Sequence, residues 1–288
     1  MVVRLFDPRL SSNRFVMTAF LLTFGLVTVF ATAWGEPVSA GASQGLHAAL
    51  TVLLSWAMAR ELDPDSPRSA AVAAVLGFLV SLTGSAQLSA VTALLFAVRI
   101  VARSTGSPPS IFDCAWLPLL AAFSARTSIG LPAALALAVA MVLDTLLPRR
   151  APMRVRFSGA VAGALAIYVA VSGDALRMQW EAPIPGQLIV LILVLCAVPS
   201  LRTPPPVSLE DLSGERVSHR RLTSARLLAV GTGLLTLLWL GGPGTAALVG
   251  LEAAVAAIAV DRWILTASRD RRRLGGEAFR STGSGGTP

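Results

Sequence analysis

A single carboxylate, Glu252, stands inside an otherwise apolar stretch of the chain. It follows Val249-Gly250-Leu251 and precedes Ala253-Ala254-Val255-Ala256-Ala257. An unpaired charge in hydrocarbon costs about 2.5–3.5 kcal/mol even on a lenient insertion scale. We therefore expect Glu252 to have one of two roles. It either couples transport to a proton or cation, or it is a structural group satisfied by an arginine or a hydroxyl.

Arg99 is the second ionisable residue within an apolar stretch. It lies one helical turn before Arg103, so the two guanidinium groups share a face of the stretch 88–102. Snorkelling of Arg99 towards the lipid headgroups explains its position without a substrate, and a contact with a substrate is the alternative.

Five aspartates are predicted at one set of helix ends: Asp63, Asp65, Asp113, Asp144 and Asp261. The simpler interpretation is a ring of salt bridges with neighbouring arginines that orients the helices. The alternative is an inner-face site for Mg²⁺ and a diphosphate, as in membrane enzymes that act on lipid or isoprenoid phosphates. Asp63-Pro64-Asp65 lacks the helical spacing of the aspartate-rich motifs in membrane prenyltransferases.

Other chemistry has little support in the residues present. All 24 basic residues are arginine, which excludes lysine-dependent phosphate loops and Schiff bases. Two histidines, His47 and His219, and two cysteines, Cys114 and Cys196, match no zinc or disulfide pattern. No hydrolase or metalloprotease motif occurs. We predict no metal and no cofactor, and an enzyme is the minority hypothesis.

The elements that position these residues follow from hydropathy and from the arginines. Over half the residues are apolar, 14% are charged and the mean hydropathy is +0.69. Ten apolar stretches are visible, and nearly every arginine falls in alternate gaps between them; only Arg126 and Arg177 do not. This positive-inside pattern predicts an all-α integral membrane bundle with both termini in the cytoplasm. The predicted spans are Phe15–Trp34, Ser43–Ala59, Ala70–Thr83, Leu88–Ala102, Ile111–Ala125, Ser128–Leu147, Phe157–Ser172, Gln187–Leu201, Leu227–Leu240 and Thr245–Leu265.

Three segments are predicted outside the bundle, which covers residues 15–265. Residues 1–14 form a cytoplasmic N-terminus, and residues 266–288, rich in glycine and serine, form a disordered tail. The sizeable cytoplasmic loop is 202–226, where Ser208 with Asp211 resembles a helix start. A helix there would place Val217 on the bilayer surface and Arg221 among anionic headgroups.

Several functional classes remain open at this stage. The formal charge of +8 has no exposed basic domain to carry it, so nucleic acid is not expected as a partner. Length, span number and internal termini resemble the drug/metabolite transporter superfamily in architecture, although no motif carries the resemblance. The leading hypothesis is a small-solute permease or exporter in a prokaryotic cell membrane, with the lipid bilayer and a small molecule as partners. A non-catalytic assembly or scaffold protein is the first alternative, and the enzyme described above is the second.

Overall fold

The computed structural model of the chain describes residues 11–82, 86–104, 106–173, 175–176, 198, 201, 204–210 and 213–264, without the side chains of 242–246. The predicted tail 266–288 and nearly all of the predicted span 187–201 lie outside the described residues. Within them the fold is all-α, as predicted. The β-type pairing among the described residues is an isolated bridge between Leu209 and Arg216.

Eight named helices and one further helical stretch, 249–264, make up the described fold. The named helices are α1 (Ser11–Ala33), α2 (Val38–Leu62), α3 (Pro67–Ser81), α4 (Leu88–Ala102), α5 (Ile111–Ser124), α6 (Gly130–Asp144), α7 (Met153–Ser172) and α9 (His219–Ala247). The bounds of α4 are those predicted. The helix α9 begins well before the predicted Leu227, and its backbone breaks at Gly241, which has φ 65° and ψ −153°.

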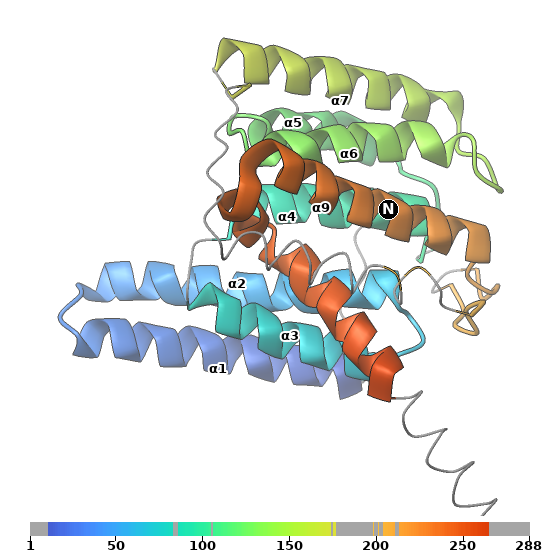
Figure 1. Cartoon of the computed structure of the whole chain (residues 1–288). Helices are drawn as coiled ribbons and strands as arrows, with labels where there is room; N and C mark the ends of the chain where they lie inside the picture. Colours follow the sequence, from blue (N-terminus) through green and yellow to red (C-terminus); the bar gives the residue numbers. More distant parts are fainter. Residues whose placement is uncertain are drawn as a thin grey trace, which may run out of the picture.

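The helices form a bundle with α4 at its centre (Figure 1). The helix α4 contacts α2, α5, α6 and α9, whereas α1 packs against α2 and α3, and α7 packs against α5 and α6. The chain reverses after Gly241, and the stretch 249–264 runs back past α2 and α4 (Figure 1). Helices at the centre of the bundle therefore meet partners on several sides, and α1 and α7 lie at its edges.

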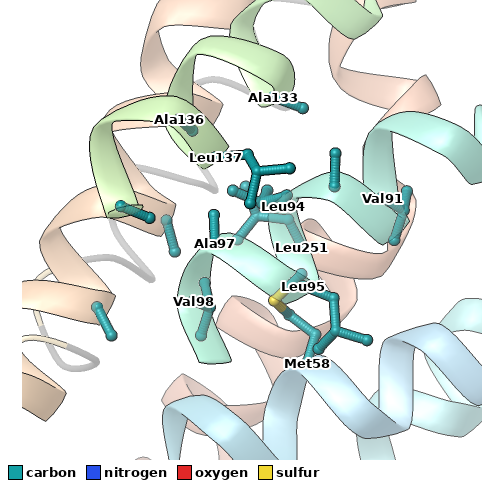
Figure 2. Close-up of a cluster of buried hydrophobic side chains, with 14 of the residues drawn as sticks. Met58, Val91, Leu94, Leu95, Ala97, Val98, Ala133, Ala136, Leu137 and Leu251 are labelled. Carbon is teal, nitrogen blue, oxygen red and sulfur yellow. The ribbon is translucent and has the colours of Figure 1, made fainter. Parts of the chain in front are cut away.

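The core forms where α2, α4, α6 and the stretch 249–264 meet (Figure 2). Met58, Leu94, Leu137 and Leu251 interlock there, each 2% exposed or less. Many of the residues between them are fully buried alanines, which let helix backbones approach closely.

In the part of the chain that the structure describes, three helices are long and apolar enough to cross a membrane: Ser11–Ala33, Met153–Ser172 and His219–Gly241. The two edge helices expose large apolar side chains, among them Leu21 at 61% and Phe157 at 72%. Such surfaces suit a lipid environment. The helices α3 to α6 are apolar but have only 14 or 15 residues.

The predicted helix start at Ser208 is wrong. Residues 204–210 are not helical, and Leu209 pairs with Arg216 instead. The hydroxyl of Ser208 donates to Asp65 at 2.5 Å. Val217 and Arg221, which were predicted at the bilayer surface, are buried. The reason is tertiary: contacts with Asp65 and Arg149 hold this segment against the bundle.

Candidate functional site

One end of the bundle is tied together by arginines, and we call it the arginine end. Ion pairs there join residues of different helices: Arg99 with Glu61, Arg103 and Arg221 with Asp144, and Arg262 with Asp63. Since the helices alternate in direction, these residues come from the ends of α2, α4 and α6, the start of α9 and the end of the stretch 249–264.

Asp144, the last residue of α6, is the centre of the largest network. Its side chain is fully buried and accepts two hydrogen bonds from Arg103, at 2.8 and 3.0 Å. Arg221 of α9 donates to the same carboxylate at 2.6 Å. Arg221 also donates to the carbonyls of Val101 and Pro148. One carboxylate therefore links α4, α6 and α9.

The network continues into the segment 204–217. The carbonyl of Arg149 accepts from Arg103 and from Arg221, while its guanidinium donates to both oxygens of Glu210 at 2.7 Å. Glu210 is 2% exposed. Arg103 and Arg149 both have left-handed backbones, with φ 50° and 59°. Residues other than glycine adopt this conformation rarely, and strain of this kind is held by the surrounding contacts.

Arg99 forms an ion pair with an acid of a neighbouring helix. Its Nε and Nη2 lie 2.8 Å from Oε1 of Glu61, and Ser104 donates to the other oxygen of Glu61. This pair ties the end of α2 to the end of α4.

A third polar group lies where α2 and the stretch 249–264 end. Asp63 accepts from Arg262 at 3.1 Å, and Asp261 accepts from Ser66 at 2.8 Å. Arg226 is 2% exposed and donates to the carbonyl of Leu62. Burial raises the pKa of Asp63, against the opposing effect of Arg262 and Arg226.

Asp65 is exposed and holds the segment 204–217 from the other side. It accepts hydrogen bonds from the backbone N–H groups of Val207 and Ser208 and from the Ser208 hydroxyl. Partial burial acts to raise the pKa of Asp65, but these hydrogen bonds outweigh it and lower the pKa below its ordinary value.

The five predicted acids thus fall into separate polar groups. Asp63, Asp65 and Asp261 lie near one another, Asp144 has its own arginines, and Asp113 forms a capping box with Ser110 at the start of α5. Among the described residues, no group of three or more His, Cys, Asp or Glu side chains is placed to hold a metal ion.

Glu252 lies in the first turn of the helical stretch 249–264. Its N–H donates to the carbonyl of Leu248, and its side chain is partly buried. Gly250 faces α2 and α4, against Val91 and the backbone of Ser55. Two residues further on, the helix has turned by about 200°, so Glu252 points away from that contact. An acid in a first turn is also favourably placed for the helix dipole.

The opposite end of the bundle has a pocket of about 890 Å³ between α1, α2 and α3. Aromatic and aliphatic side chains form most of its walls, and three polar residues of α2 line one side. Its lining includes Phe30, Trp34 and Phe78 together with Ser43, Gln44 and His47. The ring of His47 is held by a 2.8 Å hydrogen bond between Nε2 and the carbonyl of Ala86.

The sequence did not identify Glu61, Arg221 and Glu210 as members of ion pairs between helices. It also gave no indication of the pocket between α1, α2 and α3. The arginine-rich segment before the predicted span at Leu227 was interpreted as part of the cytoplasmic loop 202–226. The apolar residues Leu222, Ala225 and Ala229 recur at helical spacing through it and are buried. That periodicity was the available signal for an earlier helix start.

No family model, no curated protein and no solved structure matches the chain. The functional proposal therefore rests on the pocket, on the ion pairs at the arginine end and on Glu252.

Proposed function

We propose that the protein is a permease or exporter that moves a small solute across a prokaryotic cell membrane. The observation that carries the proposal is an asymmetry between the two ends of the bundle. One end has a pocket of about 890 Å³, and the other is held together by buried ion pairs between helices. A transporter that works by alternating access has such a form when it is closed on one side.

The proposed topology has ten spans with both termini in the cytoplasm. The arginine end would then face the cytoplasm and the pocket would face outwards. Apolar helices of 14 or 15 residues reach about 22 Å at 1.5 Å per residue, less than the hydrocarbon thickness. Neighbouring helices and local thinning of the bilayer accommodate such spans.

In this proposal Glu252 is the residue that couples transport to protons. The test is flux in proteoliposomes with an imposed pH gradient, using a panel of radiolabelled small solutes. Glu252→Gln should insert and fold but lose the gradient-driven component for any solute that the wild type carries. Glu36→Gln, which alters an exposed acid in the turn between α1 and α2, is the matched control.

The proposal fails if the wild type carries no solute of the panel. Unchanged gradient-driven flux in Glu252→Gln would mean that the protein is a permease in which the Glu252 carboxylate has only a structural role.

A non-catalytic assembly or scaffold protein is the second candidate. The observation in its favour is that Asp63, Asp144 and Asp261 each have a side-chain partner on another element. Charges arranged in this way hold helices in place without a ligand. A folded wild type with no saturable solute binding and no flux would favour this candidate.

A further inference from the structure

We infer that the pocket between α1, α2 and α3 binds a neutral amphipathic molecule with an aromatic or alicyclic body and a hydrogen-bond donor. The inference deepens the proposed function, because it names the substrate class. It can be tested by binding alone, without any measurement of transport.

The size and lining of the pocket suit a ligand of drug size. Sites for such ligands occupy about 300–1,000 Å³ and combine mostly apolar walls with a few polar groups. Phe30 and Phe78 supply aromatic surface from α1 and α3, and Trp34 supplies it from the turn that follows α1. Trp34 is 85% exposed and Phe30 59% exposed, so this surface is open to an incoming molecule.

The charge of the lining selects against ions. Among the described residues that line the pocket there is no aspartate, glutamate or arginine. An anion or a cation would lose its hydration and gain no counter-charge, which is costly. A neutral ligand avoids that cost.

His47 defines which polar group the ligand must carry. A carbonyl oxygen can only accept, so the contact with Ala86 requires Nε2 of His47 to donate. In the neutral ring, Nδ1 is then an acceptor. A hydroxyl or N–H on the ligand is the complementary group. Gln44 and Ser43, on the preceding turn of α2, can donate to or accept from the same polar part of the ligand.

Three probes of matched shape separate the possibilities. 1-Naphthol is neutral at pH 7 and has a donor, 1-methylnaphthalene has no donor, and 1-naphthoate is an anion. Binding of each radiolabelled probe is measured on the full chain in lipid nanodiscs, with empty nanodiscs subtracted. Saturable binding is expected for 1-naphthol. Because it lacks one hydrogen bond, 1-methylnaphthalene should bind about three- to tenfold more weakly than 1-naphthol. 1-Naphthoate should bind more weakly still.

Two substitutions of the same kind provide the control. His47→Phe should weaken 1-naphthol about three- to tenfold, while His219→Phe, at the start of α9, should leave it unchanged. Ser43→Trp fills the pocket from an exposed position and should abolish binding without touching His47.

A spectroscopic readout on the wild type removes any dependence on the folding of the variants. The chain has two histidines, so ring-¹⁵N labelling yields two assignable pairs of signals. 1-Naphthol should shift Nδ1 of His47 saturably and leave His219 unmoved. The inference is overturned if 1-naphthol does not bind above empty nanodiscs, if Nδ1 does not respond, or if 1-naphthoate binds as tightly as 1-naphthol. Equal binding of 1-methylnaphthalene would mean a purely lipid-like site and would also overturn it.

The binding result and the transport result can disagree informatively. Saturable, His47-dependent binding without flux of any solute would support the binding site and contradict the permease function. Flux that is unaffected by Ser43→Trp would support the permease function and contradict a role of this pocket in transport.

Discussion

Asp144 neutralises two guanidinium groups in a place that water does not reach. Its carboxylate accepts from Arg103 and Arg221, and all three side chains are at most 5% exposed. Removing one member of a buried ion pair leaves an uncompensated charge, which costs about 3–5 kcal/mol. Loss of Asp144 is therefore costly mainly because the buried guanidinium groups of Arg103 and Arg221 would remain without a counter-charge.

We predict that Asp144→Asn lowers the free energy of unfolding by about 3–5 kcal/mol. The measurement is denaturant unfolding in mixed micelles. Asp261→Asn is the matched control and should cost about 1 kcal/mol, because an asparagine oxygen can still accept from Ser66. The triple change Arg103→Met, Asp144→Leu and Arg221→Met should recover most of the loss, since it removes the three charges that meet at Asp144 together. Equal effects of the two single changes would contradict this account.

A second prediction at this scale concerns pH and Asp65. Its pKa is lowered in the folded protein, so the attachment of Val207 and Ser208 is fully present above the ordinary aspartate pKa of about 3.9. It should be lost as the pH falls through the lower, folded value. Amide hydrogen exchange at Val207 and Ser208, expressed as protection factors, measures this. Asp65→Ala, which removes the acceptor, should lose most of the protection at neutral pH, and protection that is unchanged in this variant would refute the prediction.

Some of these residues were identifiable from the sequence and others were not. Asp144 and Asp261 were predicted as salt-bridge residues because arginines follow them nearby. The partners are different, however: Arg103 and Arg221 are 41 and 77 residues from Asp144. Such pairs depend on which helices are neighbours, and local spacing does not carry that information.

At the scale of helices, close packing of α6 on α7 depends on one glycine of a pair. A Cβ on Gly159 would lie 2.9 Å from the carbonyl oxygen of Ala138, closer than real contacts allow. A Cβ on Gly163 would lie 3.5 Å from the Cβ of Ala138, which is ordinary contact. The spacing Gly159-x-x-x-Gly163 is by itself typical of close helix packing at both positions.

Gly159→Ala should therefore destabilise the protein by about 1–3 kcal/mol, because the helices must move apart. Gly163→Ala should be neutral within about 0.5 kcal/mol. The comparison is made by thermal unfolding of both detergent-solubilised variants under the same conditions. If the two variants unfold alike, the tight contact at Gly159 is not present in solution.

Helix boundaries were predictable where both ends carry a local signal. The range of α4 was predicted to the residue, since it is a largely apolar stretch bounded by Gln87 and Arg103. The start of α9 was predicted too late, because Arg221 and Arg226 are charged and yet buried. Burial of an arginine depends on carbonyls and acids of other helices. Hydropathy therefore placed the start of this helix too late.

At the scale of the whole molecule, the arginines lie mainly at one end of the bundle, with the exposed Arg126 at the other. The positive-inside rule then predicts that the end of α7 near Ser172 faces outwards. In a chain with Cys114 and Cys196 replaced by serine, Ser172→Cys should react with a membrane-impermeant thiol reagent in intact cells. Ser213→Cys, in the segment 204–217, should react only after the cells are opened. The reverse pattern would invert the proposed topology and place the pocket in the cytoplasm.

The Asp144 network also fixes an order of assembly during synthesis. Arg103 and Asp144 leave the ribosome before Arg221, so α4 and α6 can pair first through one arginine and one carboxylate. Arg221 and Glu210 are synthesised later, with the segment 204–221. Only then can the carbonyl of Arg149 accept from Arg221 and the guanidinium of Arg149 donate to Glu210. Nascent chains that end before this segment are left with a half-completed polar cluster at the arginine end.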